Sequence, residues 1–96
     1  MDWMFAVKDC TGRLIHLSKQ QWKHIVRKHA AVLPYFEEIK LTIQHPISMN
    51  QTFDDIALYV NYFKERPASE RFLVAVVKYL NNHGFIITAY FTKQSP

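Results

Sequence analysis

The chain has 96 residues, of which 49% are hydrophobic and 15% aromatic, so we expect one domain, residues 1–96, with one buried core. A net charge of +4 favours encounter with polyanions such as RNA and carries no information about the fold. The single cysteine, Cys10, excludes an intramolecular disulfide, and no apolar run reaches the length of a membrane span. We therefore expect a cytoplasmic protein without a membrane partner.

The first elements that the pattern predicts are two short strands. Trp3–Lys8 and Arg13–His16 flank a polar turn in which Gly12 can adopt positive φ.

Two helices are predicted next. Ser18 followed by Gln21 forms a capping box, which marks a helix N-terminus. The helix should end before Leu33-Pro34, and Pro34 suits the first turn of a second helix that stops at His45-Pro46. The apolar face of the first helix is predicted to hold Trp22, Ile25, Val26 and His29.

From Ile47 onward the hydrophobic period changes to two, which indicates strands. The predicted strands are Ile47–Phe53, Ile56–Phe63, Arg71–Leu80 and Phe85–Thr92. The sequence therefore predicts an α+β fold in which N-terminal helices pack on one face of an antiparallel β-sheet.

The last two strands are expected to form a hairpin with a four-residue turn that ends at Gly84. This turn pairs Lys78 with Thr88 and Val76 with Tyr90, and it gathers Lys78, Thr88 and Tyr90 on one side. The other side of the last strand, Phe85, Ile87, Ala89 and Phe91, should meet the helices, unless a cleft lies between helix and sheet. Lys78 is either a solvated residue on an open face or part of a polar cleft.

Histidine is the residue best suited to acid–base chemistry near neutral pH, and the chain has five. His29 shares the apolar helix face, where it is either a core-edge residue or a site residue, whereas His24 points to another face. His16, His45 and His83 are expected to be ordinary junction or loop residues.

The sequence lacks the residue patterns of several enzyme classes. His24 and His29 are five apart rather than four, so they do not form a helical zinc motif, and no G-x-S-x-G or glycine-rich phosphate loop occurs. The remaining His, Arg, Lys, Tyr and Thr side chains suit RNA cleavage by the 2′-hydroxyl, a reaction that requires neither a metal nor another cofactor.

A family resemblance agrees with this chemistry. The segments Trp22-Lys23-His24-Ile25 and Ile87-Thr88-Ala89-Tyr90, together with Ile15-His16-Leu17, Arg27-Lys28-His29 and Phe72–Lys78, resemble the phage-associated branch of the Barnase–EndoU–colicin–RelE nuclease superfamily. The resemblance implies a helix-then-antiparallel-sheet fold and a metal-independent ribonuclease, often a toxin or an effector module in phage proteins. A cognate antitoxin or immunity protein is then an expected partner, together with RNA.

On this sequence the resemblance implies His24 or His29 as base or acid and Arg27 and Lys78 as phosphate ligands, with Thr88 and Tyr90 positioning the phosphate. The alternative is a non-catalytic RNA- or protein-binding domain, such as one half of a toxin–antitoxin pair. An RNA-binding module would use the basic outer face of the first helix and a tyrosine for stacking. These residues are Lys19, Lys23, Arg27 and Lys28, with Tyr59 or Tyr62.

Overall fold

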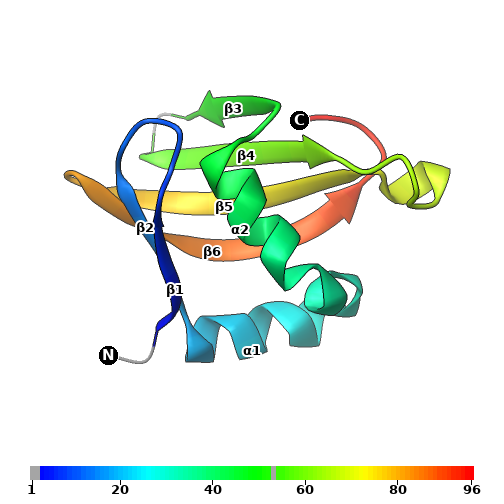
Figure 1. Cartoon of the computed structure of the whole chain (residues 1–96), viewed down its shortest axis with the longest axis horizontal. Helices are drawn as coiled ribbons and strands as arrows, with labels where there is room; N and C mark the ends of the chain where they lie inside the picture. The colour runs from blue at the N-terminus through cyan, green and yellow to red at the C-terminus, as the bar shows by residue number, and fades with distance from the viewer. Residues whose placement is uncertain (1–2, 53) are drawn as a thin grey trace.

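The computed structural model describes residues 3–52 and 54–96, in which six strands form one sheet and two α-helices pack against it (Figure 1). The predicted α+β class, with helices before most of the strands, is confirmed. Short 3-10 helices cover Ala30–Tyr35 and Ala68–Glu70. The other elements are β1 (Trp3–Lys8), β2 (Leu14–Ser18), α1 (Lys19–Lys28), α2 (Phe36–Gln44), β3 (Ser48–Gln51), β4 (Ile56–Tyr62), β5 (Phe72–Leu80) and β6 (His83–Thr92).

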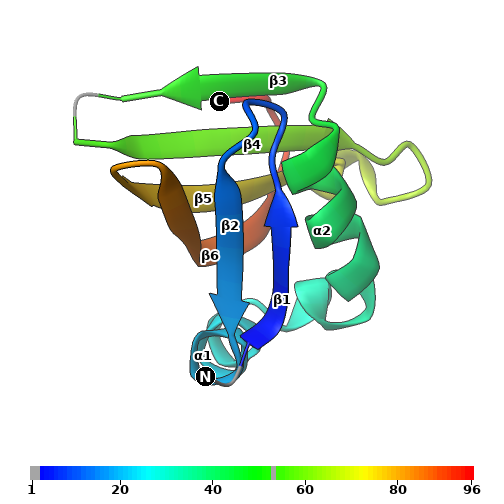
Figure 2. The same ribbon diagram turned by 60° about the vertical axis from the view of Figure 1, so that its left-hand side comes forward.

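The sheet is mixed, which corrects the prediction of an antiparallel sheet. Its strand order is β1-β2-β6-β5-β4-β3, and β2 runs parallel to β6. The parallel register pairs Leu14 with His83, Ile15 with Gly84 and His16 with Phe85. Figure 2 shows the β1–β2 hairpin standing steeply across the other strands. Strands so far apart in the chain pair through long-range packing, which local periodicity does not encode.

The core lies between the sheet and α2, which crosses in front of the central strands in Figure 1. Alternate residues of β5 point into this core together with Ile39 and Ile43 of α2. These β5 residues are Leu73, Ala75, Val77 and Tyr79. Because successive side chains of a strand alternate, Lys78 lies on the opposite face, which we call the open face. The expectation that helices meet the face opposite Lys78 holds for α2, whereas His29, next to α1, contacts Tyr90 on the open face.

The first helix begins as predicted and ends earlier than its apolar pattern. The Ser18 hydroxyl accepts a hydrogen bond from the backbone N–H of Gln21 at 3.1 Å, which is one half of the capping box, whereas the side chain of Gln21 donates to the carbonyl oxygen of Ile87. The helix ends at Lys28, so His29 is its C-cap residue rather than part of the helical stripe. Pro34 lies in a 3-10 helix, and α2 begins only at Phe36.

The β5–β6 hairpin has a shorter turn than predicted. Asn81 and Asn82 form a two-residue turn, with Asn81 at φ 50°, a left-handed conformation that asparagine tolerates. Gly84 lies inside β6 and its φ is not positive, whereas Gly12 adopts the predicted positive φ of 90°. The observed pairs are Leu80–His83, Lys78–Phe85, Val76–Thr88 and Val74–Tyr90, so the predicted register is wrong.

Because β6 contains a β-bulge, part of this strand presents its side chains on the predicted faces despite the wrong register. Val76 pairs with Thr88 and Val77 with Ile86, which leaves Ile87 as the extra residue of β6. Thr88 and Tyr90 therefore share the open face with Lys78, as predicted. On the N-terminal side of the bulge the predicted faces are wrong. Phe85, expected to meet the helices, lies on the open face, and Ile86 lies in the core.

The strand predicted before β4 is shorter than expected. β3 spans Ser48–Gln51, and Phe53, predicted as the end of this strand, lies outside the described residues. Asp54 and Asp55 lie in a turn before β4, and Asp55 has a φ of 58°.

Candidate active site

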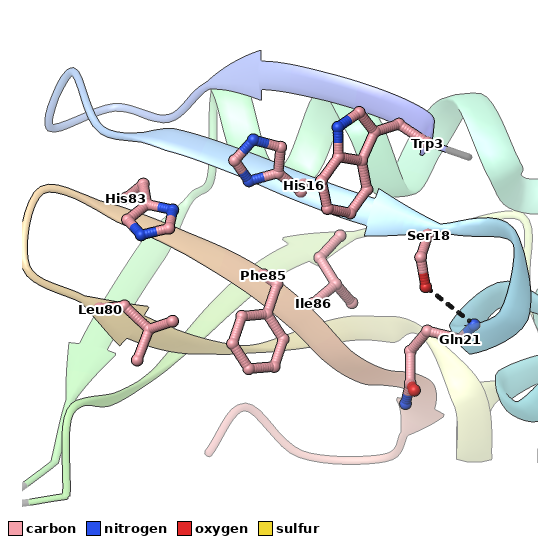
Figure 3. A pocket seen from close by; sticks show the side chains of 8 residues that line it. All are labelled: Trp3, His16, Ser18, Gln21, Leu80, His83, Phe85 and Ile86. Atoms are coloured by element: carbon pink, nitrogen blue, oxygen red, sulfur yellow. Dashed lines mark hydrogen bonds between the residues drawn. The ribbon is translucent and has the colours of Figure 1, made fainter. Parts of the chain in front are cut away.

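A cavity of about 400 Å³ opens where the β1–β2 hairpin meets β6. Its walls come from both ends of the chain: the hairpin, the start of α1 and the β5–β6 turn region (Figure 3). The residues that line it are Trp3, His16, Ser18, Gln21, Leu80, His83, Phe85 and Ile86. We call this cavity the histidine pocket, because two imidazoles share it.

His16 enters the pocket because of strand alternation. Its neighbours Ile15 and Leu17 are fully buried in the core, so His16 points to the open face. Its ring Nδ1 lies 3.1 Å from the carbonyl oxygen of Gly84. A carbonyl oxygen only accepts hydrogen bonds, so Nδ1 carries the hydrogen. In the neutral ring this leaves Nε2 with a free lone pair, as a general base requires.

His83, the first residue of β6, faces His16 in the pocket. The two ring centroids are 5.8 Å apart and the rings are nearly perpendicular. On its other side His16 contacts Trp3, with ring centroids 4.5 Å apart and an interplanar angle of 33°. The ring of His16 thus lies between Trp3 and His83 (Figure 3). Two imidazoles at this separation can act on one small group as base and acid.

The pocket also has exposed apolar walls. Trp3 is 38% exposed and Phe85 39% exposed, and Leu80 is similarly open. Large apolar side chains at a cavity mouth, beside a few fixed polar groups, are typical of small-molecule and nucleotide sites. Aromatic faces of this kind stack on nucleobases.

The predicted residues Lys78, Thr88 and Tyr90 lie on the same open face as the pocket. Lys78 pairs with the pocket residue Phe85, and its ammonium donates to the carbonyl oxygen of Asp54 at 2.8 Å. Thr88 and Tyr90 follow Phe85 along β6 and are half-buried. Lys78, Thr88 and Tyr90 thus share the open face with the pocket but are not among the residues that line it.

Of the two predicted histidines on or next to α1, His29 reaches the sheet. Its ring centroid lies 5.8 Å from that of Tyr90, and the side chain is half-buried. His24 is exposed on the helix. Arg27, a predicted phosphate ligand, is exposed on α1 as well, as are Lys23 and Lys28, predicted to bind RNA. Tyr59, suggested for stacking, is fully buried, whereas Tyr62 is 44% exposed.

Sequence patterns did not predict that His16 and His83 lie side by side. His16 sits in the alternation Ile15-His16-Leu17, which already places it on the face opposite the core. What local patterns lack is the parallel β2–β6 pairing and the two-residue turn, which together bring His83 beside it.

A second polar cluster is buried on the core side. The carboxylate of Asp9, 6% exposed, accepts hydrogen bonds from the backbone of Arg13, the backbone and hydroxyl of Thr11, and the hydroxyl of Tyr59. The hydroxyl of Tyr79 lies 3.4 Å from the same carboxylate and also contacts the hydroxyl of Tyr59. We call Asp9, Tyr59 and Tyr79 the aspartate cluster.

The surroundings of the aspartate cluster favour a charged Asp9 and a neutral Tyr59. Burial alone would raise the pKa of Asp9, but the hydrogen bonds from Tyr59, Thr11 and Arg13 outweigh it and hold this pKa below its ordinary value. Burial, reinforced by Asp9 and Tyr79, raises the pKa of Tyr59. Asp9 is thus a carboxylate and Tyr59 a protonated donor, which ties the β1–β2 turn to the central strands.

Within residues 3–52 and 54–96, His, Cys, Asp and Glu side chains form no group of three or more that would hold a metal ion. None of the described helices is long and apolar enough to cross a membrane. Comparison with protein-family models, curated proteins and solved structures gives no match to this chain.

Proposed function

We propose that the protein is a ribonuclease that cleaves RNA without a metal ion, with the histidine pocket as its active site. The observation that carries the proposal is the pair His16 and His83, one with its tautomer fixed, facing each other in an open pocket. Neither histidine belongs to the hydrophobic core, which is formed by the helices and the opposite face of the sheet.

In this mechanism Nε2 of His16 takes the proton of the ribose 2′-hydroxyl, whose oxygen forms a bond to the adjacent phosphorus. The bond from phosphorus to the 5′-oxygen breaks, and protonated His83 donates its proton to that oxygen. The products are a 2′,3′-cyclic phosphate and a free 5′-hydroxyl, so atoms and charges balance. The imidazolium of His83 also offsets the charge that develops on the phosphorane.

The residues predicted from the sequence take supporting roles in this proposal. Thr88 and Tyr90, the latter in contact with His29, lie on the same face beyond the pocket and would contact the RNA strand away from the scissile phosphate. Lys78 adds positive charge on the same face. Lys23, Arg27 and Lys28 on α1 would bind phosphates and make affinity depend on salt.

The test is cleavage of RNA in EDTA by wild-type protein and by His16→Gln and His83→Gln variants. We expect 2′,3′-cyclic phosphate ends and a loss of about 10²–10⁴-fold in rate for either variant. His45→Gln, at an exposed histidine after α2, is the matched control and should keep full activity. Equal rates for all four proteins would rule out the pocket as the site.

The exposed basic side chains of α1 favour a second candidate, an RNA-binding domain without catalysis. It predicts binding that weakens steeply with salt, with the bound RNA recovered intact. Cleavage by the wild-type protein separates the two candidates. If the protein cleaves RNA and is toxic to the cell that makes it, we expect a neutralising partner that covers the pocket, in the manner of an antitoxin or immunity protein.

A further inference from the structure

A β-bulge in β1 turns Trp3 away from the core. The register of β1 with β2 changes between Trp3 and Phe5, which leaves Met4 as an extra residue. Because side chains alternate along a regular strand, Trp3 would otherwise share the core face with Phe5. The extra residue reverses this alternation. Met4 therefore packs against the core, while Trp3 lines the histidine pocket.

In this position Trp3 stacks on His16. The ring centroids are 4.5 Å apart and the interplanar angle is 33°, so the indole presents its face to the imidazole rather than its edge (Figure 3). The hydrogen bond from Nδ1 to the carbonyl oxygen of Gly84 holds the same ring from another direction. The indole lies outside the core and is 38% exposed, so its contact with His16 is not a by-product of core packing.

The contact between the two rings depends on charge. The face of an indole carries partial negative charge and attracts cations. In the proposed reaction His16 is neutral when RNA binds, and it becomes an imidazolium when it takes the proton of the 2′-hydroxyl. The attraction to Trp3 is therefore stronger after the proton transfer than before it. An interaction that strengthens along the reaction raises kcat rather than affinity for the substrate.

We infer that Trp3 is a positioning residue for His16, an inference that rests on the proposed function of the pocket. The indole holds the imidazole in the orientation that its bond to Gly84 selects, and it stabilises the positive charge that the ring gains as the base. Phe85 is the matched comparison, because it lines the same pocket from β6 and is 39% exposed. We expect Phe85 to contact the RNA and Trp3 to act through His16.

The first test is the steady-state cleavage of RNA in EDTA. Trp3→Leu, which keeps an apolar side chain without an aromatic face, should lower kcat about fivefold to tenfold and leave KM nearly unchanged. Trp3→Phe, which keeps an aromatic face, should recover part of this loss, whereas Phe85→Leu should mainly raise KM. A rise in KM for Trp3→Leu at unchanged kcat would overturn the positioning role. Equal losses of kcat for Trp3→Leu and Trp3→Phe would overturn it as well.

The second test is tryptophan fluorescence, which needs no RNA. A protonated imidazole in contact with an indole quenches its fluorescence, so emission from Trp3 should fall as the pH is lowered. Trp22→Phe leaves Trp3 as the one tryptophan of the chain and should keep this fall. His16→Gln should abolish the fall, and His83→Gln should keep it, because the ring of His83 contacts His16 rather than Trp3. If Trp22→Phe fails to fold, wild-type protein compared with His16→Gln still decides.

The two tests separate this inference from the proposed function. A fall in emission that depends on His16, in a protein that leaves RNA intact, would confirm the contact of Trp3 with a charged His16. It would also refute the ribonuclease and, with it, the role of Trp3 in cleavage. Cleavage of RNA by a protein whose emission does not depend on His16 would overturn the role of Trp3 and leave the ribonuclease standing.

Discussion

The two polar clusters of this molecule differ in how completely the protein satisfies them. In the aspartate cluster every group is enclosed and the carboxylate of Asp9 meets several protein donors. In the histidine pocket His16 has one protein partner for one of its two ring nitrogens, and aromatic walls stand open to solvent. Polar groups whose hydrogen bonds are all made within the protein stabilise the fold. Polar groups that keep an unused hydrogen-bonding atom beside a cavity are available to a ligand.

The two clusters are connected through one element of the fold. Both involve the β1–β2 hairpin: Asp9 follows β1, and His16 lies in β2. The aspartate cluster ties the hairpin turn to β4 and β5 through Tyr59 and Tyr79, while the three residue pairs with β6 bring His16 to the pocket. Substitutions in the aspartate cluster should therefore cost more stability than substitutions in the histidine pocket.

Asp9→Ala should give the largest loss. It leaves the Tyr59 hydroxyl and the backbone N–H groups of the turn without their acceptor, and we expect the free energy of unfolding to fall by about 3 kcal/mol. Urea denaturation followed by circular dichroism measures this. Asp54→Ala, at an exposed aspartate, is the control and should change stability by less than about 0.5 kcal/mol. Equal effects would show that the cluster does not stabilise the hairpin.

Gly84→Ala should destabilise the pocket itself. A Cβ at this position would lie 2.8 Å from the backbone oxygen of Lys78 and 3.2 Å from the side chain of Ile15. The strands must move apart, which we expect to lower the free energy of unfolding by about 1–3 kcal/mol. The shift also displaces the carbonyl that orients His16, so cleavage should fall with it. Thermal unfolding that matches wild type would contradict the close packing of β5 and β6.

Low pH should lower the free energy of unfolding, because it protonates Asp9. The pKa of Asp9 is lowered in the fold, so its stabilisation is present above its unfolded pKa, near 3.8, and is lost as the pH falls through the folded value. Asp9→Asn, which does not titrate, should therefore show a smaller loss of stability than wild type below about pH 4. Urea midpoints measured from pH 6 to pH 2.5 test this; parallel curves for the two proteins would refute it.

His83→Ala should have the smallest effect on stability. The side chain is half-exposed at the pocket and lies outside the core, so we expect a change within about 0.5 kcal/mol. Its effect on cleavage should be large, since it removes the proposed acid. A loss of stability comparable to that of Asp9→Ala would assign His83 a structural role and remove the contrast between the clusters.

Much of the fold follows from local patterns. The β1 strand, the cap at Ser18 and the central strand β5 come from hydrophobic period and side-chain chemistry within a few residues. The placement of Lys78, Thr88 and Tyr90 on one face was also predicted, although through a wrong register that the bulge at Ile87 offsets.

What the sequence does not reveal depends on contacts between distant segments. The parallel pairing of β2 with β6 joins His16 to the region of His83, and the bulge at Ile87 gives Gln21 its partner. Turn length matters too, because a two-residue turn moves His83 from a loop into a strand that borders the pocket. These features follow from the balance of packing across the whole sheet.

The pH dependence of RNA cleavage tests the central claim most directly. If His16 acts as a neutral base and His83 as a protonated acid, kcat/KM measured in EDTA should follow a bell-shaped dependence on pH, because the reaction needs one group deprotonated and the other protonated. Each single His→Gln variant should lose one limb of this curve together with most of the rate. A rate that needs an added divalent metal ion, or that both variants retain, would contradict a two-histidine site.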